Sequence, residues 1–163
     1  ETGTSFRQAL YFKDVAGFRL HDTMIWRKSN PLPQVRQPRY ASCFEYMFVF
    51  SKGKPKTFNP IMRKTKYGGL ERWSKEKNVV AETGRTLKHM VFKEEALQYN
   101  IWDMQVARNK TTHPAVFPAQ LAHDHIITWS NPGDVVLDPF VGSGTTAIEA
   151  MKEKRHYVGF DIS

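Results

Sequence analysis

The stretch that constrains the fold most is "VLDPFVGSGTT", residues 136–146, in which an apolar run ends at an acid and a glycine-rich turn leads into a helix-like sequence. Gly142, Gly144 and Ala147 make the spacing G-x-G-x-x-A. After a strand and before a helix, this spacing lets the backbone approach a ligand at the amino end of the helix. The stretch therefore predicts a β-loop-α-β unit built around a ligand.

The ligand class follows from the acids around the turn. Asp161 ends the next apolar run, 23 residues after Asp138, and an acid there can accept hydrogen bonds from both hydroxyls of a ribose. A phosphate-cradling P-loop is excluded, because Thr145 stands where that loop requires lysine. A nicotinamide site fits the glycines but needs further strands beyond the second one. S-adenosylmethionine fits as well, since Asp138 can face its ammonium group, and a tight turn without any ligand stays open.

Secondary structure is expected on both sides of this unit. Apolar periodicity and turn signals predict two neighbouring strands over 18–28 and 44–54, and "VVLD" (135–138) reads as a short buried strand of the parallel type. A second strand is expected over 156–161. The predicted helices cover 4–13, 93–100, 117–130 and 145–155, with Thr145 or Thr146 near the last N-cap.

Charge is concentrated in one segment. The chain of 163 residues carries a net charge of +8, and residues 23–70, which we call the basic segment, hold ten cations and one acid. Aromatic residues lie among these cations, which favours nucleic acid, because cations meet phosphates and flat rings stack on bases. A solvated lysine-rich loop is the alternative. One cysteine excludes an intrachain disulfide, and no apolar run approaches the roughly 20 residues that a membrane span needs.

With these features in place, the chain resembles the DNA amino-methyltransferases, which methylate N6 of adenine or N4 of cytosine. "DVVLDPFVGSGTTAIEA" and "RHYVGFDIS" look like the family's motifs I and II, and "HPAVFPAQLAHDHIITWSNPGD" looks like motif X. "LHDTMIWRK" and "RYASCFEYMFVFSKGKPKTFNPI" resemble the stretches around motifs VI to VIII. The motif order resembles the β class.

The resemblance implies an α/β fold, a Rossmann-like methyltransferase sheet that is mostly parallel with an antiparallel hairpin, plus an irregular target-recognition insertion. It implies part of the catalytic subdomain over 1–54, target recognition over 55–100, and S-adenosyl-L-methionine binding over 101–163. The implied cofactor-binding residues are His113, Phe117, Pro118, Asp138, Pro139, Phe140, Gly142, Ser143, Gly144, Thr145 and Asp161. The candidate DNA-binding residues are Arg36, Arg39, Lys52, Lys54, Lys56, Arg63, Lys64 and Lys66. No metal is implied, and His123 and His125 are interpreted as helix-surface residues.

The family's catalytic motif IV, Asp/Asn/Ser-Pro-Pro-Tyr/Phe, is absent from the 163 residues. We therefore expect a chain that is incomplete at both ends and inactive alone, with the catalytic loop supplied by a segment before Glu1 or by a second chain. The implied partner is double-stranded DNA rather than a membrane. The implied setting is the cytoplasm, in a restriction-modification system of a bacterium, archaeon or phage. A non-catalytic DNA-binding module and a nicotinamide-dependent oxidoreductase remain as alternatives.

Overall fold

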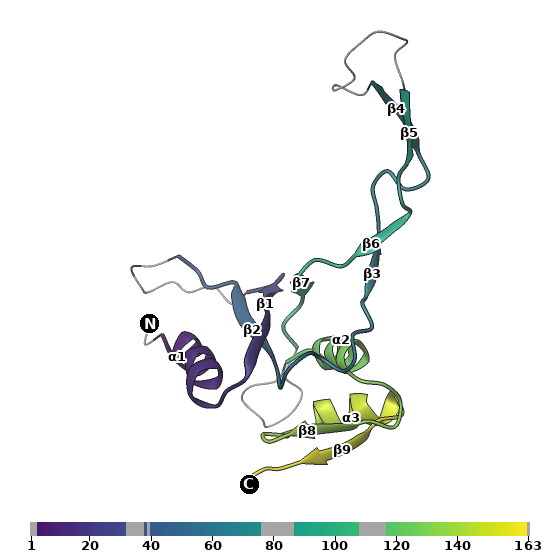
Figure 1. Cartoon of the computed structure of the whole chain (residues 1–163). Helices are drawn as coiled ribbons and strands as arrows, with labels where there is room; N and C mark the ends of the chain where they lie inside the picture. Colours follow the sequence, from purple (N-terminus) through teal and green to yellow (C-terminus); the bar gives the residue numbers. More distant parts are fainter. Residues whose placement is uncertain (1–2, 32–37, 39, 76–86, 108–116, 163) are drawn as a thin grey trace. The chain divides into compact units, whose positions relative to one another are not determined.

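The computed structural model describes residues 3–31, 38, 40–75, 87–107 and 117–162. The chain divides into two units, each of which is described by itself (Figure 1). Unit 1 comprises Glu1–Asn59 and Tyr99–Ser163, and unit 2 comprises Pro60–Gln98. The protein is of the α/β class with mixed sheets. Among the described residues, no helix combines the length and the apolar character that a membrane span requires.

The amino-terminal part of unit 1 is a helical segment followed by a three-stranded mixed sheet. Helix α1 (Thr4–Leu10) continues as the π-helical turn η1 (Tyr11–Val15), so the predicted helix over 4–13 is confirmed. Strand β1 (Arg19–Lys28) lies between β2 (Phe44–Ser51), to which it is antiparallel, and β7 (Ile101–Met104), to which it is parallel. The predicted strands over 18–28 and 44–54 are therefore confirmed as neighbours.

Alternation along β1 and β7 places large side chains on one buried face of this sheet. Met24, Trp26, Trp102 and Met104 are all buried, and Trp26 lies opposite Trp102 in the parallel register. The Trp26 indole Nε1 donates to the carbonyl of Met104 at 3.2 Å, which satisfies a polar atom that would be costly to bury alone. Side chains two residues apart point to the same face, so this pattern follows from strand geometry.

The carboxyl-terminal part of unit 1 is the predicted β-loop-α-β unit with a helix before it. Helix α2 (Ala119–Trp129) precedes β8 (Val135–Asp138), α3 (Thr145–Lys152) and β9 (His156–Gly159), and β8 pairs with β9 in parallel. The helices pack on each other through the buried cluster Ala122, Ile126 and Ala150. Phe117 and Val136 pack against this cluster from the side. The predicted helices over 117–130 and 145–155 and both predicted strands are confirmed.

Strand β8 is parallel as predicted, but the expectation that it is buried is wrong. Val135 and Leu137 are 64% and 60% exposed, and only Val136 reaches the α2–α3 core. Helices α2 and α3 cover one face of the strand, so alternate side chains on the other face remain largely exposed. The apolar sequence of β8 suits a strand that is covered on both faces. Among the described residues, only the face with Val136 is packed against a core.

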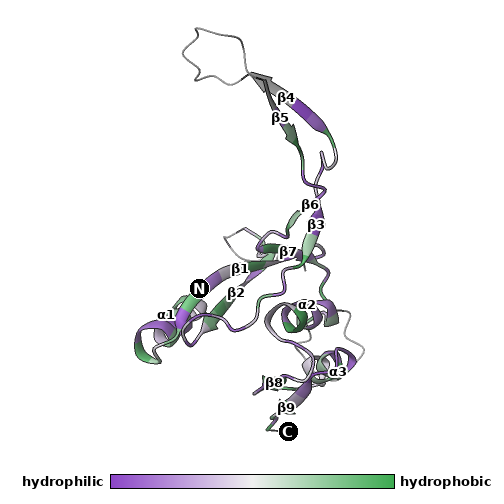
Figure 2. Ribbon diagram, turned by 45° about the vertical axis from the view of Figure 1, so that its right-hand side comes forward, coloured by the Kyte–Doolittle hydropathy of each residue, from purple (hydrophilic) through white to green (hydrophobic). Residues whose placement is uncertain are grey.

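Unit 2 consists of two antiparallel strand pairs in succession. Strand β3 (Met62–Lys64) pairs with β6 (Glu95–Leu97), and β4 (Glu71–Lys75) pairs with β5 (Leu87–Val91). The hydrophilic β4 lies beside the more hydrophobic β5 (Figure 2). In the turn between β3 and β4, a Cβ on Gly68 would lie 2.6 Å from the Cα of Glu94, so only glycine allows this approach.

The short helix predicted over 93–100 is wrong, because these residues contribute β6. Their helix-forming composition is a weak preference that tertiary contacts override. The carbonyl of Glu94 accepts the N–H of Thr65 at 2.8 Å, and the Gln98 N–H donates to the Ile61 carbonyl at 2.9 Å. These bonds to a distant strand satisfy the backbone in an extended conformation.

Candidate functional site

The candidate site is the turn between β8 and α3, where the backbone is tied to the end of β9. The Phe160 N–H donates to the Asp138 carbonyl at 3.0 Å, and the Val141 N–H donates to the Phe160 carbonyl at 2.9 Å. A Cβ on Gly159 would lie 2.9 Å from the side chain of Val141. The turn therefore packs directly on β9, and this close approach requires the glycine.

Two predicted acids meet the turn from its two sides. The Asp138 carboxylate accepts the N–H of Phe140 at 3.0 Å, and the Asp161 carboxylate accepts the N–H of Gly142 at 2.9 Å. Asp138 is half-buried and Asp161 is exposed. The structure thus brings Asp138, Gly142 and Asp161 together, as the spacing along the chain predicts. Each hydrogen bond fixes the orientation of one carboxylate against the turn.

The amino end of α3 closes the turn. Gly144 is the N-cap, with a φ of 83°, and Thr145, which was expected near the N-cap, is the first helical residue. Nothing lies within 4 Å of a Cβ on Gly144, which means that its backbone conformation, not space, favours glycine there. The hydroxyls of Ser143 and Thr145 lie 3.4 Å apart. The first N–H groups of a helix have no partner within it, and they add donors to the turn.

The remaining predicted cofactor residues differ in their surroundings. Pro118 is the N-cap of α2, and Phe117 lies against the α2–α3 core. Pro139 and Phe140 are exposed in the turn, with Phe140 86% exposed. His113 lies outside the described residues. The ring of Phe140 is therefore exposed to solvent within the turn.

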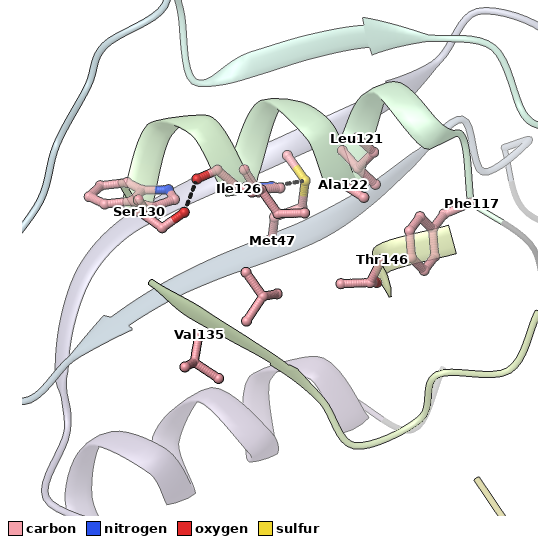
Figure 3. A pocket seen from close by; sticks show the side chains of 11 residues that line it. Met47, Phe117, Leu121, Ala122, Ile126, Ser130, Val135 and Thr146 are labelled. Carbon is pink, nitrogen blue, oxygen red and sulfur yellow. Dashed lines mark hydrogen bonds between the residues drawn. The ribbon is translucent and has the colours of Figure 1, made fainter. Parts of the chain in front are cut away.

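A cavity of about 510 Å³ lies along α2, between β8 and β2 (Figure 3). Of the predicted cofactor residues that the structure describes, Phe117 alone lines it, and Thr146 at the start of α3 is a further lining residue. The cavity therefore adjoins the turn but does not contain it. The other lining residues, which the sequence interpretation missed, are Met47, Leu121, Ala122, His125, Ile126, Trp129, Ser130, Val135 and Val136. The α2 residues in this set recur three or four positions apart, and this helical spacing was the signal that could have placed them on one face of the helix.

His125 is not the surface residue that was expected. Its ring lies 4.7 Å from the ring of Trp102, and its Nε2 lies 3.3 Å from the sulfur of Met47. Burial lowers the pKa of His125, because the imidazolium form loses its water, and the charge of Asp124 opposes this only in part. His125 is thus an uncharged member of the cavity wall near neutral pH.

His123 lies on another face of α2 and links this helix to the end of α3. Its Nδ1 lies 2.9 Å from the Asp124 carboxylate, and its Nε2 lies 3.3 Å from the carboxylate of Glu153. The hydrogen bond to Asp124 raises the pKa of His123, with the charges of Asp124 and Glu153 adding to it and partial burial opposing it. Within the described ranges, no three His, Cys, Asp or Glu side chains are grouped so that they could hold a metal ion.

The candidate DNA-binding residues are divided between the two units. Lys52, Lys54 and Lys56 are exposed after β2 in unit 1, and the Lys52 ammonium lies 5.7 Å from the ring of Phe18. In unit 2, the lining of a groove of about 670 Å³ contains three cations and two aromatic rings together with one acid and apolar side chains. The cations and rings are those of Arg63, Lys66, Lys93, Tyr67 and Phe92, and the acid is Glu95. Lys64 is exposed on β3. Arg36 and Arg39 lie outside the described residues.

This arrangement fits a specific chemistry. Two carboxylates and a set of backbone donors surround a turn that carries no basic side chain between Asp138 and Ala147. Such a turn can accept hydrogen bonds from sugar hydroxyls and face an ammonium group, but it offers no side-chain cation to a pyrophosphate.

Sequence comparison identifies a family and several relatives. The profile of a family described as DNA methylase (N6_N4_Mtase) matches residues 2–163. The orphan methyltransferase M.BamHII of Bacillus amyloliquefaciens is 47% identical over 173 residues, an alignment that covers 100% of this chain and 64% of that relative. The type II methyltransferase M.SmaI of Serratia marcescens is 28% identical, over 90% of this chain and 43% of that relative. The chain therefore spans less than two thirds of the length of these relatives.

Solved structures resemble the chain over nearly its whole length. The cytosine-N4-specific PvuII DNA methyltransferase matches 98% of this chain and 52% of its own, with a TM-score of 0.69 at 21% identity. The complex of M1.HpyAVI with SAM matches 99% of this chain and 64% of its own, with a TM-score of 0.57 at 25% identity. At 21% identity, the first likeness concerns the fold alone.

Proposed function

Because the chain belongs to the DNA methylase family of N6 and N4 methyltransferases, we propose that its β8–turn–α3 unit binds S-adenosyl-L-methionine for methyl transfer to adenine N6 or cytosine N4 in DNA. The observation that carries this proposal is the hydrogen bond of Asp161 with the Gly142 N–H at 2.9 Å. It holds an acid from the end of β9 at the edge of the glycine turn, where the carboxylate can accept hydrogen bonds from ribose hydroxyls.

The donor set fits this cofactor better than a dinucleotide. Asp138 at the end of β8 supplies a negative charge for the ammonium of the methionine part. Asp161 supplies acceptors for the ribose, and no lysine or arginine in the turn is placed to neutralise a pyrophosphate. Phe117 and Pro118, at the amino end of α2, are the remaining described residues that we assign to the methionine end.

The reaction places modest demands on titrating groups. When bound, the cofactor supplies a methyl group on a sulfonium centre. The exocyclic amine would attack that methyl in line, with the thioether sulfur of S-adenosylhomocysteine as the leaving group, and would then lose a proton. The protein must therefore mainly hold the two partners in line and take the base out of the stack. The residues of this chain serve the first task by fixing the orientation of the turn and its acids.

We further propose that the catalytic tetrapeptide and the central part of a Rossmann-like sheet lie outside these 163 residues. Three observations support this proposal. The sequence contains no motif IV, the chain spans 64% of its relative M.BamHII, and the described strands of unit 1 form two separate sheets with a cavity between them. The exposed Val135 and Leu137 on β8 are then a face that another part of the protein covers.

DNA binding is assigned to cations in both units. Unit 2 falls within the segment 55–100, and its groove combines Arg63, Lys66 and Lys93 with the rings of Tyr67 and Phe92. This combination of cations and rings supports a role of 55–100 in target recognition. In this assignment, segment 1–54 belongs to the catalytic subdomain and segment 101–163 to cofactor binding. Arg36 and Arg39 complete the proposed set together with Lys52, Lys54, Lys56 and Lys64.

Calorimetric titration of the 163-residue chain tests the cofactor assignment. We expect saturable binding of S-adenosylhomocysteine and none of NAD, because the two acids at the turn suit an ammonium group and ribose hydroxyls and would repel a pyrophosphate. Binding of NAD without binding of S-adenosylhomocysteine would overturn the proposal in favour of an oxidoreductase. A DNA-binding module without catalysis is the second candidate, and the absent motif IV favours it. Methylation by the protein with its upstream coding sequence included distinguishes the two.

A further inference from the structure

The carboxyl end of α2 is closed by a residue that is distant in sequence. The last carbonyls of a helix have no partner within it. The Asn59 N–H donates to the Thr128 carbonyl at 2.8 Å, and its side-chain Nδ2 donates to the Ile127 carbonyl at 3.1 Å. Asn59 thus serves two successive carbonyls at the end of α2.

The interactions of Asn59 extend past the helix end. Its Nδ2 also lies 3.2 Å from the carbonyl of Ser130 and 3.2 Å from the side-chain oxygen of Asn131. The preceding Phe58 packs its ring 5.1 Å from the ring of Trp129, the last residue of α2. The side chain of Asn59 is nevertheless exposed, so its replacement leaves no buried cavity.

Asn59 is also the last residue before unit 2, which begins at Pro60. The ring of proline fixes its own φ, which removes one backbone rotation directly after the residue that is hydrogen-bonded to α2. Where the chain returns from unit 2 to unit 1, after Gln98, Asn100 is hydrogen-bonded to a different element. Its Nδ2 donates to the Thr23 carbonyl of β1 at 3.2 Å, and its own carbonyl accepts the Ile25 N–H at 2.8 Å.

The two ends of helix α2 are therefore next to different parts of the protein. Its amino end follows Phe117 and Pro118, which we assign to the cofactor, and its carboxyl end is held by the residue that leads into unit 2. We propose that Asn59 is a positioning residue that couples DNA binding by unit 2 to cofactor binding at the amino end of α2. This inference rests on the proposed function, and it adds a residue that contacts neither ligand.

The expected sign of the coupling is positive. DNA bound to unit 2 restrains the chain at Pro60, and through Asn59 it restrains the carboxyl end of α2. A helix already held at one end loses less freedom when its other end closes on a ligand. Reciprocity requires that the cofactor then tightens DNA binding by the same factor.

The test measures Kd for S-adenosylhomocysteine with and without saturating mixed-sequence duplex DNA, for the wild-type chain and two variants. We expect DNA to tighten binding at least about fivefold in the wild type, the lower range of measured couplings. In Asn59→Ala, we expect the two Kd values to agree within about twofold, because every side-chain hydrogen bond of residue 59 to the end of α2 is lost and only its backbone N–H bond remains. Asn100→Ala is the matched control, since it removes the same side-chain amide from a residue that is hydrogen-bonded to β1 instead of α2. In this variant, DNA should tighten binding of S-adenosylhomocysteine by the same factor as in the wild type.

The isosteric Asn59→Asp keeps the size of the side chain but sets a carboxylate against the carbonyls at the negative end of α2, so it should also lose the coupling and should melt below the wild type. Equal coupling in Asn59→Ala and wild type, equal loss in Asn100→Ala, or a wild-type Kd that DNA leaves unchanged would each overturn the inference. A wild type that binds no S-adenosylhomocysteine at all would instead overturn the proposed function.

Discussion

At the scale of single residues, Asp161 combines a structural hydrogen bond with a proposed binding role. Its carboxylate is held against the Gly142 N–H at 2.9 Å, yet the side chain is exposed and so remains open to a ligand. A carboxylate whose orientation is already fixed enters further hydrogen bonds with less loss of freedom. This makes Asp161 the most informative single position in the candidate site.

Asp161→Ala should weaken binding of S-adenosylhomocysteine. Hydrogen bonds to a charged group contribute about 1.5–3 kcal/mol, so we expect Kd to rise about 10- to 150-fold in a calorimetric titration. The matched control is Asp14→Ala, an exposed acid beside Lys13 and far along the chain from the turn. An affinity in Asp161→Ala equal to that of the control would remove Asp161 from the site.

His123 should make the link between α2 and α3 sensitive to pH. The hydrogen bond to Asp124 raises its pKa in the folded state above the ordinary value of 6.5. Its stabilising contribution is therefore fully present below pH 6.5 and is lost as the pH rises through the raised pKa. Since the ring is partly exposed, we expect no more than about 1 kcal/mol.

Thermal melts of wild type and His123→Gln at a series of pH values measure this contribution. The wild type should melt higher by a few degrees at pH 5.5 to 6.5, about 2–4 °C per kcal/mol for a domain of this size, and the difference should shrink by pH 9. Comparison of the two proteins cancels groups that they share, including His125, whose pKa burial lowers. A difference that grows with pH would contradict the assignment.

At the scale of elements, the glycine turn depends on its packing against β9. A methyl on Gly159 would meet both the Cβ and a methyl of Val141 at 2.9 Å, so one of the two segments must shift. The same turn carries Gly142 and the acids around it. The close approach of turn and strand is thus a condition for the geometry of the whole site.

Gly159→Ala should destabilise the protein by about 1–3 kcal/mol, the usual cost of overpacking, as measured by urea unfolding. Val141→Ala removes both methyls of the clash and keeps only the Cβ at 2.9 Å, so the double variant should be more stable than the sum of the two single changes predicts. The expected interaction energy is about 0.5–3 kcal/mol in a double-mutant cycle. Strict additivity would show that Gly159 and Val141 do not meet.

At the scale of the whole molecule, the basic segment should supply the cations that bind phosphates. Lys52, Lys54 and Lys56 are exposed cations after β2. Replacing all three by alanine should reduce the slope of log affinity against log salt by about 0.9 for each lysine that binds a phosphate in the wild type. The weakening should be similar for specific and nonspecific DNA, because binding to phosphates carries no sequence information.

The control for this change is the alanine variant of Lys13, Lys152 and Lys154, three cations outside the basic segment. Both variants lose the same charge, so a general effect of net charge would shift their salt slopes equally. An unchanged slope in the Lys52, Lys54 and Lys56 variant, with folding intact, would show that these lysines only solvate the turn around Gly53.

Methyl transfer by the 163-residue chain alone should be undetectable, because it lacks the tetrapeptide that holds the target amine. The assay incubates the chain with tritiated S-adenosylmethionine and mixed-sequence duplex DNA. Transfer above a no-protein background would place the catalytic group inside this sequence. In that case, the three asparagines that directly precede a proline are the first to replace, namely Asn30, Asn59 and Asn131.

The sequence by itself determined the elements whose signals are local. The glycine spacing, the acid at residue 138 and the apolar periodicity of 117–130 predict the β-loop-α-β unit and α2, because turn chemistry and helix formation depend on residues a few positions apart. The concentration of charge in the basic segment is equally a property of composition. The membership of the DNA methylase family followed from the same local motifs.

Only the tertiary structure decided features that depend on residues far apart in the chain. Residues 93–100 prefer a helix locally but pair with β3, and β8 has the composition of a buried strand but keeps one face exposed. The contact of His125 with Met47 in the cavity wall joins residues that are 78 positions apart. The hydrogen bond of Asn59 with Ile127 at the end of α2 joins residues that are 68 positions apart. No local pattern encodes such pairs, because the free energy that selects them comes from burial and from hydrogen bonds that exist only once the chain has folded.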